Sequence, residues 1–286
     1  MSDDEARGNL TSDIATEMGL HTEQLSGRSQ QVFFSASEEE NLLYPDAPVV
    51  DFAKHAEIDA LQLEGPDVNR RISKLMADGV GSITVRNPGA KHSLCVGILN
   101  RLKLHFDGSL GYFGCGLLDG PNVTVAGRVG WSCGENMMAG TIVIEKNAGS
   151  TFGATIRGGD LICRGDVGSR TGIDMKGGTI LVGGRTGILS GFMMQRGRMV
   201  ILGDAGNDLG DSMYDGTIYV GGAIASLGVD AVEADLSELD VAWLTRKLAL
   251  YGMQAPNGVE NLQKVVAGRK LWNYDNLEPS EKKLIL

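Results

Sequence analysis

A glycine pattern, Gly-x-x-Gly-x-x-x-Gly, recurs with a step of 19 residues through the stretch 102–222, and no insertion interrupts it. One copy begins with Lys146 instead of glycine, and an upstream copy carries Cys115 in its third slot. A fixed period of this length predicts a repeat architecture in which each unit is one coil stacked on its neighbours. The glycines that we expect to form the turns are Gly127, Gly130, Gly134, Gly149, Gly153, Gly165, Gly168, Gly172, Gly184, Gly187, Gly191, Gly203, Gly206 and Gly210.

Apolar residues keep the same step and indicate where the strands lie. The first column consists of Leu104, Val123, Ile142, Leu161, Ile180, Met199 and Ile218. The second column, two residues further along the chain, consists of Phe106, Val125, Ile144, Cys163, Val182, Ile201 and Val220. Alternation with period 2 indicates a strand with one face turned inward. A column beyond the glycines predicts a second strand in every coil: Leu118, Met137, Ile156, Met175, Met194 and Met213.

Like residues stacked on successive coils predict an all-β fold, a parallel β-helix with 19-residue coils and flanking N- and C-terminal helical segments. We expect it to be right-handed, because parallel crossover connections almost always are. Glycine would turn the chain where φ is positive or where a close backbone approach leaves no room for a Cβ. Three inward side chains, each worth about 1.5–3 kcal/mol when buried, cannot order one coil alone, so coils need neighbours.

The sequence predicts an arm and a capping helix in residues 1–80. Residues 1–40 are acidic and weakly patterned, and we expect a mobile arm there, followed by a segment, 42–64, that drapes over the first coil. Asp67 is expected to cap an amphipathic helix that ends at Gly79 and closes the open end of the solenoid. The apolar face of this helix comprises Val68, Ile72, Leu75 and Met76.

The predicted β-helix occupies residues 81–235, and residues 236–286 form a C-terminal helix and a docking tail. The first part, 81–100, is interpreted as strand, Pro88-Gly89 turn and second strand. Ser237 to Asp240 resembles a capping box, and Gly252 marks the end of the helix that it opens. Apolar residues on one face of that helix are Val241, Leu244, Leu248 and Tyr251; the tail carries Trp272 and Tyr274.

Composition and charge exclude several functional classes. A formal net charge of -10 argues against a nucleic-acid partner and against binding to an anionic membrane. The chain has no run of 18 apolar residues, and its acidic N-terminus has no signal-peptide core, so we expect a soluble, cytoplasmic protein. Its cysteines, Cys95, Cys115, Cys133 and Cys163, lack metal-ligand spacing and are expected to be reduced apolar residues.

The search for reactive residues predicts no catalytic, cofactor-binding or metal-binding site. The histidines, His21, His55, His92 and His105, are scattered. Phosphate-loop spacing is absent, and the glycines punctuate coils instead of joining a strand to a helix. Asp166, Asp204 and Asp211 are interpreted as turn residues. The outward column is expected to be solvated or to face a partner: Met138, Arg157, Lys176, Gln195 and Tyr214.

The stretches GYFGCGLLDGPNVTVAGRVGWSCGENMMAGTIVIEKNAG and GDAGNDLGDSMYDGTIYVGG resemble the GXGXG domain of the glutamate synthase large subunit, over about residues 80–235. The resemblance implies a right-handed β-helix without catalytic residues that holds amidotransferase and FMN domains in place. As a separate chain, it is similar to the GXGXG subunit of N-methylglutamate synthase (methylamine–glutamate N-methyltransferase). That likeness implies a hetero-oligomer with an amidotransferase-like subunit and an FMN-binding subunit, FMN being held by the partner and no cofactor by this chain.

Two other functions stay open at this stage. The first is a stand-alone β-helical carbohydrate-active protein, which an outward aromatic ladder with paired acids would favour, and the sequence shows no such ladder. The second is a GXGXG subunit of a formylmethanofuran dehydrogenase-type complex, since that complex contains a related module.

Overall fold

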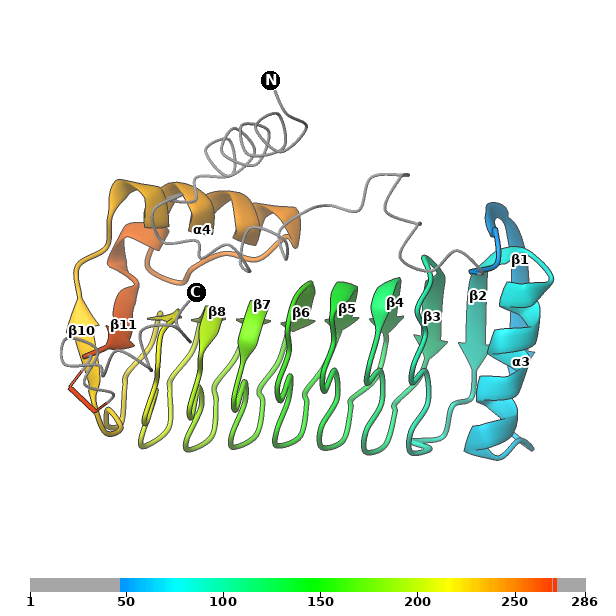
Figure 1. Cartoon of the computed structure of the whole chain (residues 1–286), viewed down its shortest axis with the longest axis horizontal. Coiled ribbons are helices and arrows are strands. Elements are labelled where there is room, and N and C mark those ends of the chain that lie inside the picture. The colour runs from blue at the N-terminus through cyan, green and yellow to red at the C-terminus, as the bar shows by residue number, and fades with distance from the viewer. Residues whose placement is uncertain (1–46, 269, 272–286) are drawn as a thin grey trace, which may run out of the picture.

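The computed structural model describes residues 47–268 and 270–271, and its centre is one sheet of 11 strands (Figure 1). The strands follow the order β1-β2-β3-β4-β5-β6-β7-β8-β9-β11-β10. The elements are β1 (Asp51–Asp59), α3 (Gly65–Ala77), β2 (Val80–Arg86), β3 (Lys103–Asp107), β4 (Asp119–Val125), β5 (Ala139–Ile144), β6 (Asp160–Cys163), β7 (Lys176–Val182), β8 (Arg196–Ile201), β9 (Thr217–Val220), β10 (Ala231–Ala234), α4 (Glu238–Leu250), a 3-10 turn (Val259–Asn261) and β11 (Gln263–Ala267).

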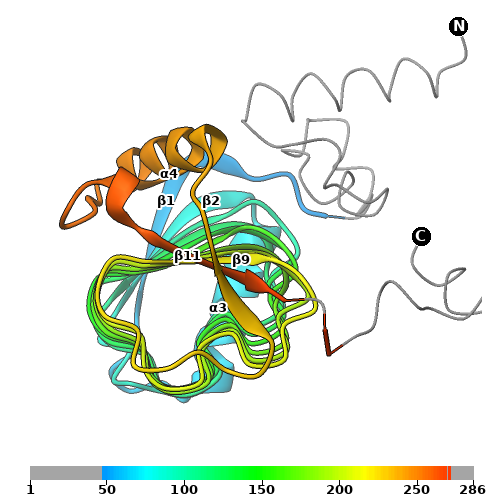
Figure 2. The same cartoon turned by 90° about the vertical axis from the view of Figure 1, so that its left-hand side faces the viewer.

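The parallel β-helix is confirmed, and so is its register. From β3 to β9 each strand pairs in parallel with the next, and residues 19 apart are direct partners, as in Leu161 with Ile180. The two alternating columns are buried inside the coils. Stacked coils therefore share one continuous core along the axis. Figure 2 shows the stacked coils end-on.

The third column is buried as expected, but the second strand predicted for it is wrong. Met137, Met175 and the other members are fully buried. Each comes directly after a residue with positive φ, for example Asn136 (φ 54) and Asp174 (φ 53), and a left-handed residue interrupts an extended strand. Isolated backbone hydrogen bonds link the coils there, such as Arg157 N–H to Met137 O at 2.8 Å.

The N-terminal end of the solenoid is closed by a helix and extended by a strand (Figure 1). Helix α3 confirms the predicted amphipathic helix, with Val68 and Ile72 buried in the same core as the strand columns. Its N-cap is Glu64 and not Asp67, because Pro66 occupies the first turn, where its missing N–H costs nothing. Residues 51–59 do not drape over the coil but form β1, which pairs in parallel with β2.

Residues 81–100 contain one of the two predicted strands. The first is confirmed as part of β2. The second is wrong, since the backbone of Ala90, Ser93 and Cys95 has φ between 52° and 58° and forms turns. The Ala90 and Ser93 N–H groups donate to the next coil, Ser93 to Tyr112 O at 2.8 Å, whereas the Cys95 N–H donates to Asn69 Oδ1 of α3 at 2.9 Å.

At the other end, the chain turns back over its own sheet. Strand β11 pairs antiparallel with both β9 and β10 and so covers the last parallel edge. The capping box is confirmed, with Ser237 as N-cap of α4 and the Asp240 side chain returning to it, and Gly252 follows the helix with φ 61. Helix α4 lies on the outer face of the sheet (Figures 1 and 2). The arm of residues 1–40 and the tail with Trp272 and Tyr274 lie outside the described residues.

Candidate functional site

Each Gly-x-x-Gly-x-x-x-Gly copy has three glycine positions, which we call its first, second and third slots. The glycine in the first slot leaves room for a side chain of the preceding coil. A Cβ on Gly184 would collide with the Oδ1 atom of Asp166, and one on Gly222 with that of Asp204. These carboxylates accept hydrogen bonds from backbone N–H groups one coil on, Asp166 from Arg185 and Asp204 from Ala223, both at 2.8 Å. The backbone hydrogen bond from Arg185 is the main cause that lowers the pKa of Asp166. Asp166 and Asp204 thus lie between strands, but their hydrogen bonds join neighbouring coils instead of closing a local turn.

The second slot needs glycine because successive coils approach closely there. Gly168 does not have positive φ, yet its Cβ would lie 2.5 Å from the backbone nitrogen of Ser150. At Gly149 the Cβ would lie 2.5 Å from Cδ1 of Trp131. Real carbon atoms do not approach this closely, so a side chain at this slot forces neighbouring coils apart.

The third slot is the one with positive φ, and it faces the core. Gly134, Gly153, Gly172, Gly191 and Gly210 have φ between 65° and 73°. A Cβ on Gly153 would meet the side chains of Leu161 and Ile180. Cys115 occupies this slot in the upstream copy with φ 57, and its thiol is buried in the core. The three slots therefore have three different physical reasons for glycine.

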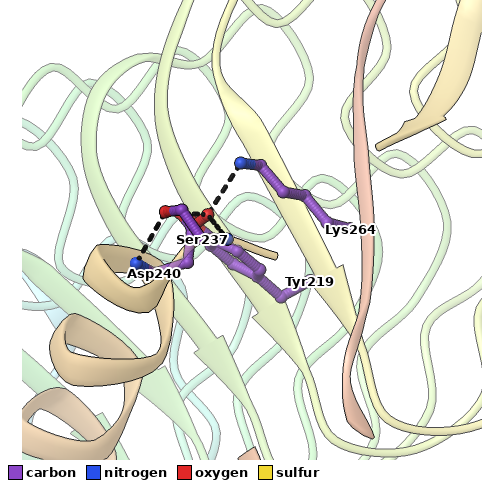
Figure 3. Close-up of polar contacts among 4 residues, drawn as sticks. All are labelled: Tyr219, Ser237, Asp240 and Lys264. Carbon is purple, nitrogen blue, oxygen red and sulfur yellow. Dashed lines mark hydrogen bonds and ion pairs between the residues drawn. The ribbon is translucent and has the colours of Figure 1, made fainter. Parts of the chain in front are cut away.

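Polar groups hold α4 on the sheet, and Asp240 is their centre (Figure 3). Tyr219 on β9 donates its hydroxyl to Asp240 Oδ1 at 2.6 Å, and Lys264 on β11 donates to Oδ2 at 2.7 Å. The Ser237 backbone N–H donates to the same Oδ2 at 2.9 Å. Burial alone would raise the pKa of Asp240, but the hydrogen bonds from Lys264, Tyr219 and Ser237 outweigh it and lower the pKa to about 2.

A second polar contact fixes the other end of α4. Asp160 accepts two hydrogen bonds from Lys247 at 2.8 and 2.9 Å and one from the Tyr251 hydroxyl. The guanidinium of Arg198 lies 4.5 Å from the ring centroid of Trp243, at cation–π distance. These charges are satisfied within the fold, so the outer face of β6–β9 is a structural junction and not an exposed reactive surface.

Sequence reasoning missed this junction, although the sequence carries a signal for it. The residue between the two inward strand columns points outward. It is polar in His105 and Thr124 and then becomes apolar in Val143, Ile162, Leu181, Val200 and Tyr219. The last four are buried against Trp243, Leu244 and Leu248 of α4. A change from polar to apolar on the outward side predicts a covered sheet face.

The structure keeps the candidate histidines apart and the cysteines buried. His55 lies on β1, His92 next to Tyr112 and His105 on β3, while His21 lies outside the described residues. Burial raises the pKa of Cys163 to about 11, so this thiol stays protonated near neutral pH. Among the described residues, no group of three or more His, Cys, Asp or Glu side chains is placed to hold a metal ion.

The surface carries a row of three aromatic rings that the repeat pattern did not predict. The His92 and Tyr112 ring centroids are 4.7 Å apart, and those of Tyr112 and Trp131 are 5.4 Å apart, with interplanar angles of 17° and 27°. His92 Nδ1 also accepts the Tyr112 backbone N–H at 2.8 Å. Residues 112 and 131 are one 19-residue coil step apart, but residue 92 lies 20 residues before 112, because the repeat is irregular where it begins.

Fold and turns together define a parallel β-solenoid whose coils turn on glycine. A family model described as GXGXG motif matches residues 80–236, more than half of the chain, so the chain belongs to the GXGXG motif family. Protein GlxC from Rhizobium meliloti (strain 1021) is 43% identical over 63 residues, which is 22% of this chain and 28% of GlxC. The aligned stretch thus spans less than a third of GlxC. The resemblance to a GXGXG domain of the glutamate synthase type is confirmed.

In the part of the chain that the structure describes, no helix is both long enough and apolar enough to cross a bilayer.

Proposed function

We propose that this chain is a non-catalytic structural subunit of a heteromeric, FMN-dependent glutamate synthase-like complex. It would hold an amidotransferase-like subunit and an FMN-binding subunit together, in the cytoplasm. The observation that carries the proposal is the GXGXG domain itself, which covers residues 80–236. A second support comes from three carboxylates whose hydrogen bonds hold the fold together. Asp166 joins neighbouring coils, and Asp160 and Asp240 hold α4 on the sheet.

The experiment is co-expression of the tagged chain with its two proposed partners, followed by affinity purification. The expected result is a complex of three polypeptides that contains FMN, whereas the chain purified alone contains none. FMN retained by the isolated chain would contradict the structural role. Failure of the tagged chain to retain either partner would contradict the complex.

We further propose that the complex is an N-methylglutamate synthase in preference to an ordinary glutamate synthase. The two reactions differ in the nitrogen compound that reaches the flavin-containing subunit. Supplying the purified complex with methylamine and glutamate should yield N-methylglutamate and ammonia. Formation of glutamate from glutamine and 2-oxoglutarate with a two-electron reductant, without N-methylglutamate, would favour the ordinary reaction. Partner polypeptides of a formylmethanofuran dehydrogenase type would support the remaining alternative.

The aromatic row gives little support to a carbohydrate-active protein. Sugars bind to the open faces of aromatic rings, and here the faces are used within the row. Tyr112 lies between the rings of His92 and Trp131, and Trp131 lies against Gly149 of the next coil.

A further inference from the structure

We propose that Cys95, Cys115 and Cys133 form a redox site in the core, at which hydrogen peroxide oxidises Cys115 to a disulfide with one of its two neighbours. We name the three residues the thiol row. They come from consecutive coils at the end of the solenoid that α3 closes, and they are 1%, 0% and 0% exposed. This chemistry needs no partner subunit, and it goes beyond the proposed structural role.

Backbone hydrogen bonds between the coils set the positions of the thiol row. Cys115 N–H donates to Leu94 O at 2.9 Å, which places Cys115 directly opposite Cys95. Gly134 N–H donates at 3.0 Å to the carbonyl before Cys115, so Cys133 lies one residue off the position opposite Cys115. Such pairing spaces Cα atoms about 4.8 Å apart, and an offset of one residue makes the distance about 6 Å. Both distances lie within the range of about 4.4–6.8 Å that a disulfide needs.

Only Cys115 can reach both of the other thiols. Cys95 and Cys133 are two coil steps apart, which is about 10 Å and too far for a disulfide. Any disulfide within the thiol row therefore includes Cys115.

The sulfur atoms of the thiol row contact one another. The thiols of Cys133 and Cys95 both donate hydrogen bonds to the sulfur of Cys115. These hydrogen bonds lower the pKa of Cys115, although burial opposes them, and they raise the pKa of both donors together with burial. Because the thiolate is the reactive form of cysteine, Cys115 is the residue that attacks the oxidant.

Cys163 provides a control thiol in the same core. It donates to the Lys146 carbonyl at 3.1 Å, and burial raises its pKa to about 11. The coils on either side of it, residues 142–160 and 180–198, contain no cysteine. Cys163 therefore has neither the acidity nor the partner for a disulfide.

The thiol row ends under α3, which gives the oxidant a route. Asn69 Oδ1 accepts the Cys95 N–H at 2.9 Å, and Asn69 Nδ2 donates to Ser93 O at 2.7 Å. Figure 1 shows α3 across this end of the solenoid. A terminal unit has neighbours on one side only, so it opens more readily than the centre. Local opening of α3 exposes the Cys95 end of the row while the other coils stay folded.

The oxidation balances with hydrogen peroxide as the electron acceptor. The Cys115 sulfur attacks one peroxide oxygen, the O–O bond breaks, and the other oxygen leaves as water with the proton of the Cys115 thiol. The neighbour's sulfur then displaces the hydroxyl group of the sulfenic acid, which leaves as water with the neighbour's proton. Two thiols and one peroxide thus give one disulfide and two waters. A dithiol such as dithiothreitol reverses the reaction by exchange.

The experiment treats the folded full chain with hydrogen peroxide, alkylates the remaining thiols in denaturant and maps the peptides by mass spectrometry. Half of the four thiols should be lost in one intramolecular disulfide that contains Cys115, and dithiothreitol should restore them. Cys163 should still react with the alkylating agent. That result would show that the chain was oxidised while folded, because unfolding exposes every thiol.

Variants of the thiol row and of its cover sharpen the test. Cys115→Ala should abolish the disulfide, whereas Cys163→Ala should form it as the wild type does. At least one of Cys95→Ala and Cys133→Ala should still form it, because each leaves Cys115 one partner. Asn69→Ala removes both hydrogen bonds that tie α3 to the row and should raise the oxidation rate at least threefold. Thermal melting identifies any variant that does not fold.

Two results would overturn the redox site. If the folded wild type and Asn69→Ala both kept all their thiols, the thiol row would be apolar packing only. If Cys115→Ala lost two thiols at the wild-type rate, the disulfide would form elsewhere. Neither result changes the proposed complex, which is tested by partner binding.

Discussion

Tyr219 and Asp240 form a 2.6 Å hydrogen bond between β9 and α4, and this bond links the outer face of the solenoid to the helix that covers it. Asp240 is buried and also opens α4 as the third helical residue of the capping box. One carboxylate thus satisfies a helix end, a tyrosine and the ammonium of Lys264.

Tyr219→Phe should destabilise the protein by about 1–3 kcal/mol, because a buried carboxylate loses a donor that water cannot replace. A double-mutant cycle with Asp240→Ala measures the coupling between the two groups in chemical denaturation. A coupling energy indistinguishable from zero would show that the hydrogen bond does not stabilise the junction.

The pH dependence of stability should also report Asp240. Its pKa in the folded protein is about 2, below the ordinary value of 3.8, so folding favours the ionised form. The resulting contribution, about 2 kcal/mol at most, is complete above pH 4 and is lost as the pH falls toward 2. The stability difference between wild type and Asp240→Asn should therefore shrink across that interval. A constant difference from pH 5 to pH 2 would contradict the lowered pKa.

Gly168→Val should cost several kcal/mol, because the new Cβ would lie 2.5 Å from the Ser150 nitrogen in the coil before it. Gly116→Ala is the control, since a Cβ there would lie 3.5 Å from the nearest atom, the Glu135 carbonyl oxygen. Thermal melting compares the two. If Gly168→Val melted within about a degree of wild type, the close approach at the second slot would be wrong.

The inward methionine column gives a further prediction. Met175 is fully buried, so Met175→Asp places a carboxylate in the core without a partner and should disrupt several coils. Met175→Leu keeps volume and polarity and should cost less than about 1.5 kcal/mol. Equal stabilities for the two variants would mean that this column faces solvent.

The repeat made the register predictable, because a 19-residue step fixes which residues stack and a two-residue alternation fixes which of them point inward. Local backbone conformation was less predictable. Residues such as Asn136 and Thr155 adopt positive φ although they are not glycine, since hydrogen bonds between coils hold them there. No single-coil pattern contains that information, so the third column was mistaken for a strand.

Contacts between distant segments were harder still to predict. The capping box located α4, but its position on the sheet depends on Lys247 and Asp160, which are 87 residues apart in the chain. The aromatic row was missed for a related reason. Its first member, His92, precedes the regular repeat, and only the folded coil brings it against Tyr112.

The central claim is that this chain holds two other subunits together, and native mass spectrometry of the two proposed partners tests it most directly. The partners are measured with and without the chain at equal concentrations. A flavin-containing assembly of all three polypeptides, formed only when the chain is present, is the predicted result. Assembly of the two partners alone, with the chain neither required nor incorporated, would contradict the structural role.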